Sequence, residues 1–452
     1  MGVMPVRRLL ITMSLPMMIS MLVQALYNVV DSMFVSYISE YALTAVGLAF
    51  PAQNLMISVG VGTGVGVNAL LSKSLGEKNF DAANKAAVNG IFLAFCSWAA
   101  FALLGGFFSR TFMALQTDVP EIIAYGDTYL TIIAVASVGM MFQICFERLL
   151  QSTGKTIYTM LSQGLGAVIN LILDPLLIFG LGPFPAMGIA GAALATILSQ
   201  FLSFCLLVGG TFRGTNIPLS FRQFRPSLDK YRIILANGLP SFWRQALASL
   251  ATILLNVAGR NCGGDTVVAA MSIVSRVTMF AGSGIIGFGQ GYQPVCGFNY
   301  GAGLYGRVRE AFHFFFRVAL IAALALSILG FLFAPQVVAL FRRDDPEVIY
   351  IGALALRLQC ITFPLMSWLF PASMTLQTIG RSFKATVLAM CRQGLTFVPL
   401  ILVLPYLWGV FGIQASQPLA DILTFAVALP MGLGVLRELR LAQEGAEAQG
   451  TA

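Results

Sequence analysis

The chain has 452 residues, of which 58% are hydrophobic and only 10% carry a charged side chain. Soluble globular proteins carry about 25% charged residues, so this composition excludes an ordinary soluble domain and indicates a protein surrounded by lipid. The formal net charge of +8 is better explained by basic residues in membrane-protein loops than by nucleic-acid binding. The seven cysteines form no CxxC or CxxH pair, and His313 is the only histidine, so neither a disulfide framework nor a zinc site is indicated.

Apolar runs recur along the whole chain, and about 20 such residues span the hydrocarbon core of a bilayer. The runs are separated by polar, Gly or Pro breaks. They predict an all-α integral membrane protein with twelve transmembrane helices at 9–37, 42–72, 84–108, 119–146, 156–180, 186–212, 231–259, 266–297, 308–333, 347–377, 383–408 and 411–436. We expect an N-lobe at 1–212 with helices 1–6, a cytoplasmic linker at 213–230, and a C-lobe at 231–452 with helices 7–12 and a short cytoplasmic tail.

The distribution of basic residues predicts the orientation. When loops are assigned to alternating sides, 18 of the 27 Lys and Arg residues lie on the side of both termini, and only Arg110, Arg260, Arg342 and Arg343 lie in the opposite loops. Cytoplasmic loops are enriched in Lys and Arg. Both termini are therefore expected in the cytoplasm, and the location is expected to be a bacterial inner membrane.

The chain also contains an internal repeat. Segment 149–155 (LLQSTGK) resembles 375–381 (TLQTIGR), and 188–191 (GIAG) resembles 409–412 (GVFG). Each half has an even number of helices, so both halves have the same orientation. We expect two pseudo-symmetric six-helix bundles, related by an axis along the membrane normal with a cavity between them, which is a common transporter plan. Glycines are concentrated in the second helix of each half, which predicts close packing there.

Polar side chains lie deep within the apolar runs of the first half. Asp31 lies well inside helix 1, Asn170 and Asp174 share one face of helix 5, and Thr196 lies within helix 6. Acids in lipid are costly and are usually functional, although Asp174, which precedes Pro175, also fits a structural position at a helix end. Two carboxylates with amide and hydroxyl oxygens suit Na⁺. Two adjacent carboxylates also suit a proton, so both ions remain open.

The second half places four arginines near the middle of its helices, with one acid at that depth, Asp421. In one interpretation Arg276 or Arg357 pairs with Asp421, and the others bind carbonyls at helix ends. In the other, some arginines face water and bind an anionic or zwitterionic substrate. The candidate residues of the substrate cavity are Arg244, Gln245, Arg276, Arg357, Arg392 and Asp421, with Gln24, Tyr27 and Asn28 of helix 1. Pro16 predicts a bend in helix 1, either a passive kink or a moving hinge.

Several segments resemble the multidrug and toxic compound extrusion (MATE) family, in its bacterial MepA-like and DinF-like branch. The resemblance runs in order along essentially the whole chain, at 15–16 (LP), 24–31 (QALYNVVD), 149–155, 170–175 (NLILDP), 188–193 (GIAGAA), 290–294 (QGYQP) and 299–302 (NYGA). It implies a cation-coupled antiporter that exports small organic compounds, such as drugs or metabolites, by alternating access between two lobes. It further implies that Asp31, Asn170, Asp174 and Thr196 form the cation or proton site, and that Pro16 is the bend of helix 1.

The alternative function is a flippase for an anionic lipid-linked precursor, as in related members of the same superfamily. A membrane enzyme is not expected, because the chain shows no catalytic constellation. We expect a small-molecule substrate, Na⁺ or H⁺ as the coupling ion, no other cofactor, no nucleic acid, and a monomer in the lipid bilayer.

Overall fold

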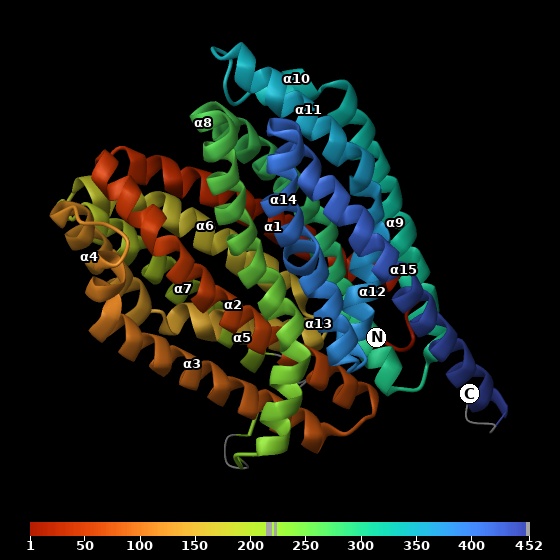
Figure 1. The fold of residues 1–452 in the computed structure, drawn as a ribbon. Helices are drawn as coiled ribbons and strands as arrows, with labels where there is room; N and C mark the ends of the chain where they lie inside the picture. The colour runs from red at the N-terminus through yellow and green to blue at the C-terminus, as the bar shows by residue number, and fades with distance from the viewer. Residues whose placement is uncertain (214–218, 221–223, 449–452) are drawn as a thin grey trace. The chain divides into compact units, whose positions relative to one another are not determined.

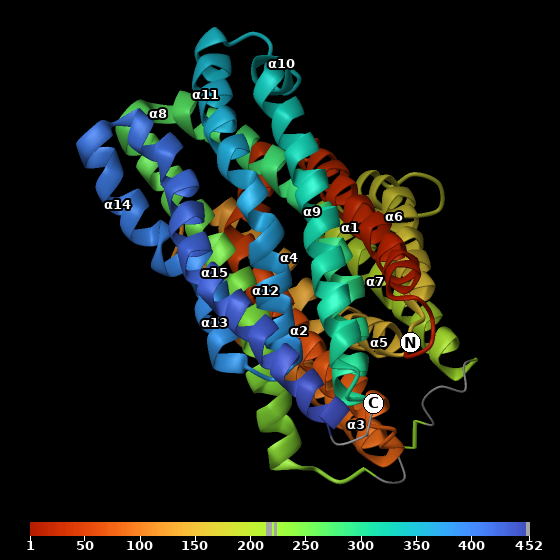
Figure 2. The same cartoon turned by 90° about the vertical axis from the view of Figure 1, so that its right-hand side faces the viewer.

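A computed structural model describes residues 1–213, 219–220 and 224–448, and the side chains of 28–33 and 35–36 lie outside the described set. Within these residues the chain is helical and contains no strand (Figures 1 and 2). The α-helices, with one 3₁₀ turn (η2) and one π-turn (η3), are α1 Val6–Ser36, α2 Glu40–Gly76, α3 Phe80–Ala114, α4 Pro120–Val135, α5 Val138–Ser152, α6 Thr156–Phe179, α7 Ile189–Phe212, α8 Leu228–Gly301, α9 Tyr305–Leu332, α10 Ala334–Ala339, α11 Pro346–Thr362, η2 Phe363–Leu365, α12 Met366–Thr378, α13 Ser382–Met390, η3 Cys391–Leu395, α14 Phe397–Trp408 and α15 Val410–Ala448.

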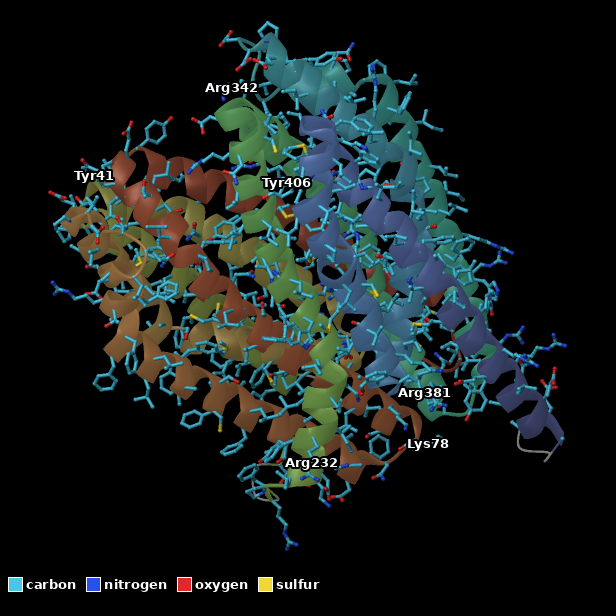
Figure 3. All side chains as sticks on the ribbon, in the orientation of Figure 1. Tyr41, Lys78, Arg232, Arg342, Arg381 and Tyr406 are labelled. Carbon is cyan, nitrogen blue, oxygen red and sulfur yellow. The ribbon has the colours of Figure 1, made fainter. Side chains whose placement is uncertain are left out.

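The helices confirm the predicted all-α membrane architecture. Ten helical segments of the described chain are long and apolar enough to cross a membrane, and the bent pair of α4 and α5 makes one more span. The 74-residue α8 is broken at Gly264, where φ is 66° and ψ is −155°, so it comprises two spans. Twelve spans result. Large apolar side chains such as Phe107 and Phe383 are exposed, as expected where lipid is the solvent. Tyr406, which is labelled in Figure 3, is also exposed.

The chain divides into two compact units. We call residues 15–238 the N-unit, and residues 1–14 with 239–452 the C-unit. They differ from the lobes expected from the sequence in two places, since the first 14 residues group with the C-unit and residues 231–238 group with the N-unit. Within the C-unit the Ser14 hydroxyl donates to the carbonyl of Phe288 over 3.0 Å, so the first turns of α1 pack on α8.

Matching backbone turns support the internal repeat. Gly154 and Gly380, each just after the end of a helix, have φ of 87° and 88°. Gly188 and Gly409, each just before the last helix of a half, have φ of 56° and 59°. Residues with a Cβ rarely adopt positive φ, so glycine at all four positions fits the local backbone. The two halves therefore form the same turns at equivalent places.

The glycines of α2 serve close packing inside the N-unit. A Cβ on Gly60 would come within 3.0 Å of Ile144, and one on Gly64 within 2.9 Å of Arg148, both on α5. A Cβ on Gly66 would lie 1.9 Å from the carbonyl oxygen of Ile234 at the start of α8. The sequence prediction of close packing at helix 2 is therefore confirmed.

Five labelled residues show where the ends of each unit lie. In the N-unit, Lys78 and Arg232 lie at one end and Tyr41 at the other (Figure 3). In the C-unit, Arg381 lies at the end that holds both chain termini, and Arg342 lies at the opposite end (Figures 1 and 3).

Candidate functional site

Three polar residues predicted in helices 5 and 6 lie together inside the N-unit. Asn170 and Asp174 are one turn apart on α6, Thr196 is on α7, and the three are 1%, 0% and 6% exposed. The Asn170 amide is oriented by its neighbours, so that its nitrogen donates to Asp174 Oδ2 over 2.7 Å and its oxygen accepts from the Thr196 backbone N–H over 3.2 Å. The cluster therefore holds a buried carboxylate that is bonded by a neutral amide.

Close packing of α6 and α7 positions this cluster. A Cβ on Gly191 would lie 2.4 Å from the carbonyl oxygen of Leu177, so the two backbones nearly touch beside Asp174. Farther along the same helix pair, the hydroxyls of Ser162 and Ser203 each donate to the other residue's carbonyl, over 3.3 and 3.0 Å. Small residues permit this approach, which brings the Thr196 N–H within reach of the Asn170 amide.

The helix-1 candidates are only partly described. The side chains of Asp31 and Asn28 lie outside the described residues, so their convergence with Asp174 stays a prediction. Gln24 is exposed and Tyr27 is half-buried.

Pro16 lies within α1, which is helical on both sides of it. The Ser20 hydroxyl donates to the Pro16 carbonyl over 2.9 Å. Pro16 also lies two residues past Ser14, the last residue of α1 that groups with the C-unit. The bend itself remains a prediction.

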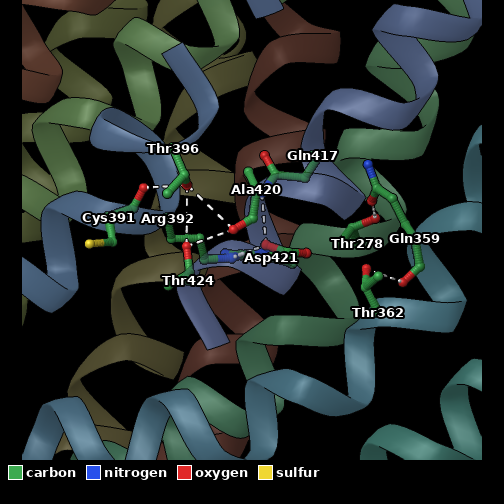
Figure 4. Close-up of polar contacts among 10 residues, drawn as sticks. All are labelled: Thr278, Gln359, Thr362, Cys391, Arg392, Thr396, Gln417, Ala420, Asp421 and Thr424. Atoms are coloured by element: carbon green, nitrogen blue, oxygen red, sulfur yellow. Dashed lines mark hydrogen bonds and ion pairs between the residues drawn. The ribbon is translucent and has the colours of Figure 1, made fainter. Parts of the chain in front are cut away.

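A second polar cluster lies in the C-unit (Figure 4). Arg392 Nε donates to Asp421 Oδ1 over 2.9 Å, and Gln417 Nε2 donates to the same oxygen over 2.9 Å. The Arg392 and Asp421 side chains are 21% and 5% exposed. The hydroxyls of Thr396 and Thr424 lie beside the pair, 3.3 Å apart. In this cluster the carboxylate charge is neutralised by an arginine.

The partner of Asp421 corrects the interpretation that paired it with Arg276 or Arg357. The pair is formed by Arg392, which lies on the π-turn η3 next to α15. Arg357 instead donates to the carbonyl of Phe331 over 3.3 Å and lies 5.7 Å from the centre of the Phe331 ring. The expectation that some arginines bind carbonyls near helix ends therefore holds for Arg357.

Arg276 and Arg244 have different surroundings. Arg276 is exposed and forms no hydrogen bond or ion pair with the described part of the chain. It lies about 18 Å along the helix from the break at Gly264, which places it near the middle of a span. Arg244 is half-buried and donates to the Ser241 hydroxyl over 3.4 Å, and Gln245 beside it is also half-buried. An arginine at the depth of Arg276 requires water or a polar ligand.

The two polar clusters occupy equivalent helix pairs. In the N-unit, α7 contacts α6 where Gly191 faces the carbonyl of Leu177. In the C-unit, α15 contacts α14 where Gly412 faces the carbonyl of Leu404, and a Cβ added to Gly412 would lie 2.2 Å from that carbonyl oxygen. Equivalent residues of the two halves are 226 positions apart before η3, as for Gly154 and Gly380. After η3 they are 227 positions apart, as for Leu177 and Leu404. The additional residue is accommodated by η3, because a π-turn contains one more residue than an α-turn. The same helix pair thus carries a buried acid in each unit, bonded by the Asn170 amide in the N-unit and paired with Arg392 in the C-unit.

The sequence interpretation missed three charged residues of the N-unit. Asp127 on α4 accepts hydrogen bonds from the hydroxyls of Ser109 and Thr131. Its signal was an acid eight residues inside the apolar run predicted at 119–146. Glu147 and Arg148 lie on α5 and are each 5% exposed. They were missed because the predicted helix 4 ended at residue 146, whereas α5 continues to Ser152.

Comparisons with known proteins agree with this architecture. The MatE family model matches residues 16–176 and 240–403, one segment in each half of the chain. A protein named FAD transporter from Shewanella oneidensis is 28% identical over 435 residues, covering 93% of this chain and 92% of that protein. The multidrug export protein MepA of Staphylococcus aureus is 22% identical over 427 residues, covering 94% and 93%.

Solved structures show the same fold. A MATE transporter in complex with MaL6 superposes with a TM-score of 0.91 at 26% identity, covering 97% of this chain and 98% of that one. A Pyrococcus furiosus transporter of the MOP superfamily, whose structure is described as having a binding pocket of reverse polarity, gives 0.90 at 26% identity over 97% of both chains. The family model covers more than half of the sequence, and the structural likeness extends over nearly all of it. This chain is therefore a membrane transporter of the MatE (MATE) family.

Proposed function

We propose that this transporter is an antiporter driven by Na⁺ or H⁺, and that the coupling ion binds at Asp174 in the N-unit. The observation that carries the proposal is the complete burial of the Asp174 carboxylate beside the Asn170 amide, whose nitrogen donates to it over 2.7 Å. A carboxylate at this depth is costly unless it is functional. A proton or Na⁺ bound at Asp174 would neutralise its charge.

The cluster supplies the ligands that either ion requires. Na⁺ prefers oxygen ligands, and the cluster offers the Asp174 carboxylate and the Asn170 amide oxygen, with the Thr196 hydroxyl on the adjoining helix α7. Asp31 of helix 1 is proposed as the second carboxylate. Antiport follows if the ion and the substrate each stabilise a different orientation of the carrier, because each ligand then shifts the population toward the state it binds better.

We propose an anionic or zwitterionic organic compound as the substrate. Arg276 is exposed near the middle of a span and has no bond to the described residues, so a substrate carboxylate or phosphate is a suitable partner for its planar guanidinium. The likeness to the FAD transporter of Shewanella oneidensis supports this class, because FAD carries an anionic pyrophosphate. FAD is therefore the first probe.

The proposed location is a bacterial inner membrane, with both termini in the cytoplasm and the transporter acting as a monomer. The excess of basic residues in one set of loops supports this orientation. A flippase for an anionic lipid-linked precursor would use the same arginines, so such a precursor is the comparison substrate in the test.

The test is uptake into proteoliposomes that carry an imposed Na⁺ or H⁺ gradient. FAD, a cationic dye and a lipid-linked anionic precursor are compared for the wild type, Arg276→Gln and a control variant, Arg440→Gln. Arg440 is suitable because it lies in an exposed ion pair with Glu444. The proposal predicts gradient-driven FAD flux that falls in Arg276→Gln and is unchanged in Arg440→Gln. Equal transport of the cationic dye by the wild type and Arg276→Gln would overturn the proposal of an anionic or zwitterionic substrate. Transport of the lipid-linked precursor alone would favour the flippase.

A further inference from the structure

Two charged residues next to each other on α5 are buried in the N-unit, away from Asp174. Glu147 and Arg148 are each 5% exposed within a membrane-spanning segment. Gln163 Nε2 and Gln143 Nε2 both donate to Glu147 Oε1, over 2.7 and 3.4 Å. Burying a carboxylate in a membrane protein is costly unless its charge is compensated or used.

Arg148 does not form an ion pair with Glu147 or with any other described acid. Its Nη1 donates to Gln151 Oε1 over 2.8 Å, and the Ser152 hydroxyl donates to Asn68 Oδ1 over 2.7 Å. Three buried donors of this network, Arg148 Nε, Gln151 Nε2 and Asn68 Nδ2, have no acceptor among the described residues. Such donors are uncommon in protein interiors, and each calls for an explanation.

The other half of the chain shows that the fold does not require these charges. At the offset of 226 residues, the equivalents of Glu147 and Arg148 are Ser373 and Met374. The helix contact is the same, since an added Cβ on Gly64 would touch Arg148 and one on Gly289 would touch Met374. Both halves therefore bury a long side chain against a glycine, and only the N-unit makes it charged.

A glutamine follows this residue pair in both halves, and the hydrogen bonds of its side-chain amide are complete in the C-unit only. Gln377, the equivalent of Gln151, donates to the Ser241 hydroxyl over 2.9 Å and accepts from Gln293 over 3.3 Å. Gln151 accepts from Arg148 but has no acceptor for its own nitrogen among the described residues. The amide of Gln377 is therefore bonded at both its nitrogen and its oxygen, whereas the amide of Gln151 is bonded only at its oxygen.

The surroundings leave Arg148 as the buried charge that opposes Glu147. Helices α2, α3, α6 and α7 pack against α5. Their described titratable and charged groups, with those of α5 itself, are Glu40, Tyr41, Lys73, Asp81, Lys85, Cys96, Arg110, Cys145, Arg148, Tyr158, Asp174 and Cys205. Lys73 and Lys85 pair with Glu77 and Asp81 at a helix end, and Asp174 belongs to the other cluster. Among these described groups, Arg148 is the one buried base.

We propose that Glu147 is a second proton-binding carboxylate of the transport cycle, with Arg148 as the group that converts its protonation into a conformational change. The proton binds at Oε2, because both described hydrogen bonds go to Oε1. With Glu147 ionised, the adjacent pair has no net charge. With Glu147 protonated, Arg148 is a buried cation without compensation, and the α2–α5 packing becomes less stable than a state in which the guanidinium reaches water. The inference rests on the proposed ion coupling.

Hydrogen exchange tests the proton site without using transport. The peptide 138–152 of α5 is compared with its equivalent 366–378 of α12 between pH 5 and pH 8, after correction for the intrinsic pH dependence of exchange. The purified wild-type protein should lose protection in α5 at low pH, and α12 should not change. The variant Glu147→Ser/Arg148→Met, which gives the N-unit the residues of the C-unit, should fold and lose this difference. An equal pH response of both peptides, or a double variant that does not fold, overturns the proposal.

Transport separates this inference from the proposed function. In Glu147→Gln, gradient-driven uptake should fall about tenfold or more, within the range of coupling free energies between sites, while substrate exchange without a gradient continues. Glu147→Gln with wild-type driven uptake overturns the role of Glu147, and the antiport proposal then stands if Asp174→Asn still abolishes driven uptake. If the wild type shows no ion-driven uptake but α5 still loses protection at low pH, the antiport proposal fails and Glu147 remains a proton site.

Discussion

The ion pair between Arg392 and Asp421 predicts a specific coupling between two substitutions in the C-unit. Arg392 Nε lies 2.9 Å from Asp421 Oδ1, and the side chains of Arg392 and Asp421 are 21% and 5% exposed, respectively. Removing one partner of a buried pair costs about 3–5 kcal/mol. The partial exposure of Arg392 and the remaining bond from Gln417 to Asp421 reduce this to about 2–3 kcal/mol for Asp421→Asn or Arg392→Gln. The double variant leaves no unpaired charge, because two amides replace the ions, and should cost only about 1 kcal/mol.

The assay is a double-mutant cycle of unfolding free energies, measured by equilibrium denaturation in mixed detergent micelles. The expected interaction energy is about 3 kcal/mol or more, since each single variant leaves a buried charge that the double variant removes. The substitution of Arg440, which lies in an exposed pair, is the control and should change stability by about 0.5 kcal/mol or less. Additive effects of Asp421→Asn and Arg392→Gln would refute the neutralised pair.

Two further predictions concern packing and substrate. Gly191→Ala and Gly412→Ala place a Cβ 2.4 and 2.2 Å from a backbone oxygen of the preceding helix, and each should destabilise the protein by about 1–3 kcal/mol or more. The control Gly434→Ala, with nothing within 4 Å of its Cβ, should be tolerated. Equal melting temperatures for the three variants would contradict the helix contact. Arg276→Gln should weaken FAD binding about tenfold, whereas Arg357→Gln should leave it unchanged because the Arg357 guanidinium already binds the carbonyl of Phe331. Titration of the two purified variants with FAD measures both affinities. Equal affinities would remove Arg276 from the substrate site.

The spans and the repeat were predictable from the sequence because they depend on local patterns. Apolar run length gave the spans, and the repeated segments 149–155 and 375–381 end at glycines with nearly equal φ. The grouping of Asn170 with Asp174 follows from helical spacing, and Thr196 joins them through the close contact at Gly191. These inferences need only the chain's own periodicity and the tendency of buried polar groups to meet.

The pairing of charges was not predictable, because it depends on which helices are neighbours. Arg392 and Asp421 meet through the contact of η3 with α15, and the one-residue shift of the π-turn has no clear signature in the sequence. Glu147 and Arg148 resemble the polar end of a helix in the sequence, and only the packing of α2 against α5 buries them. The coupling ion was not predictable either, since carboxylate, amide and hydroxyl groups accommodate both a proton and Na⁺.

The central claim is that the coupling ion binds to the buried acid of the N-unit, Asp174, and not to Asp421, the arginine-paired acid of the C-unit. Gradient-driven FAD uptake in proteoliposomes, measured side by side for Asp174→Asn and for the charge-neutral double variant Arg392→Gln/Asp421→Asn, tests it most directly. We predict that Asp174→Asn abolishes driven uptake under both Na⁺ and H⁺ gradients, while the double variant retains it. Driven uptake that survives in Asp174→Asn and is lost in the double variant would contradict the claim and move the coupling site to the C-unit.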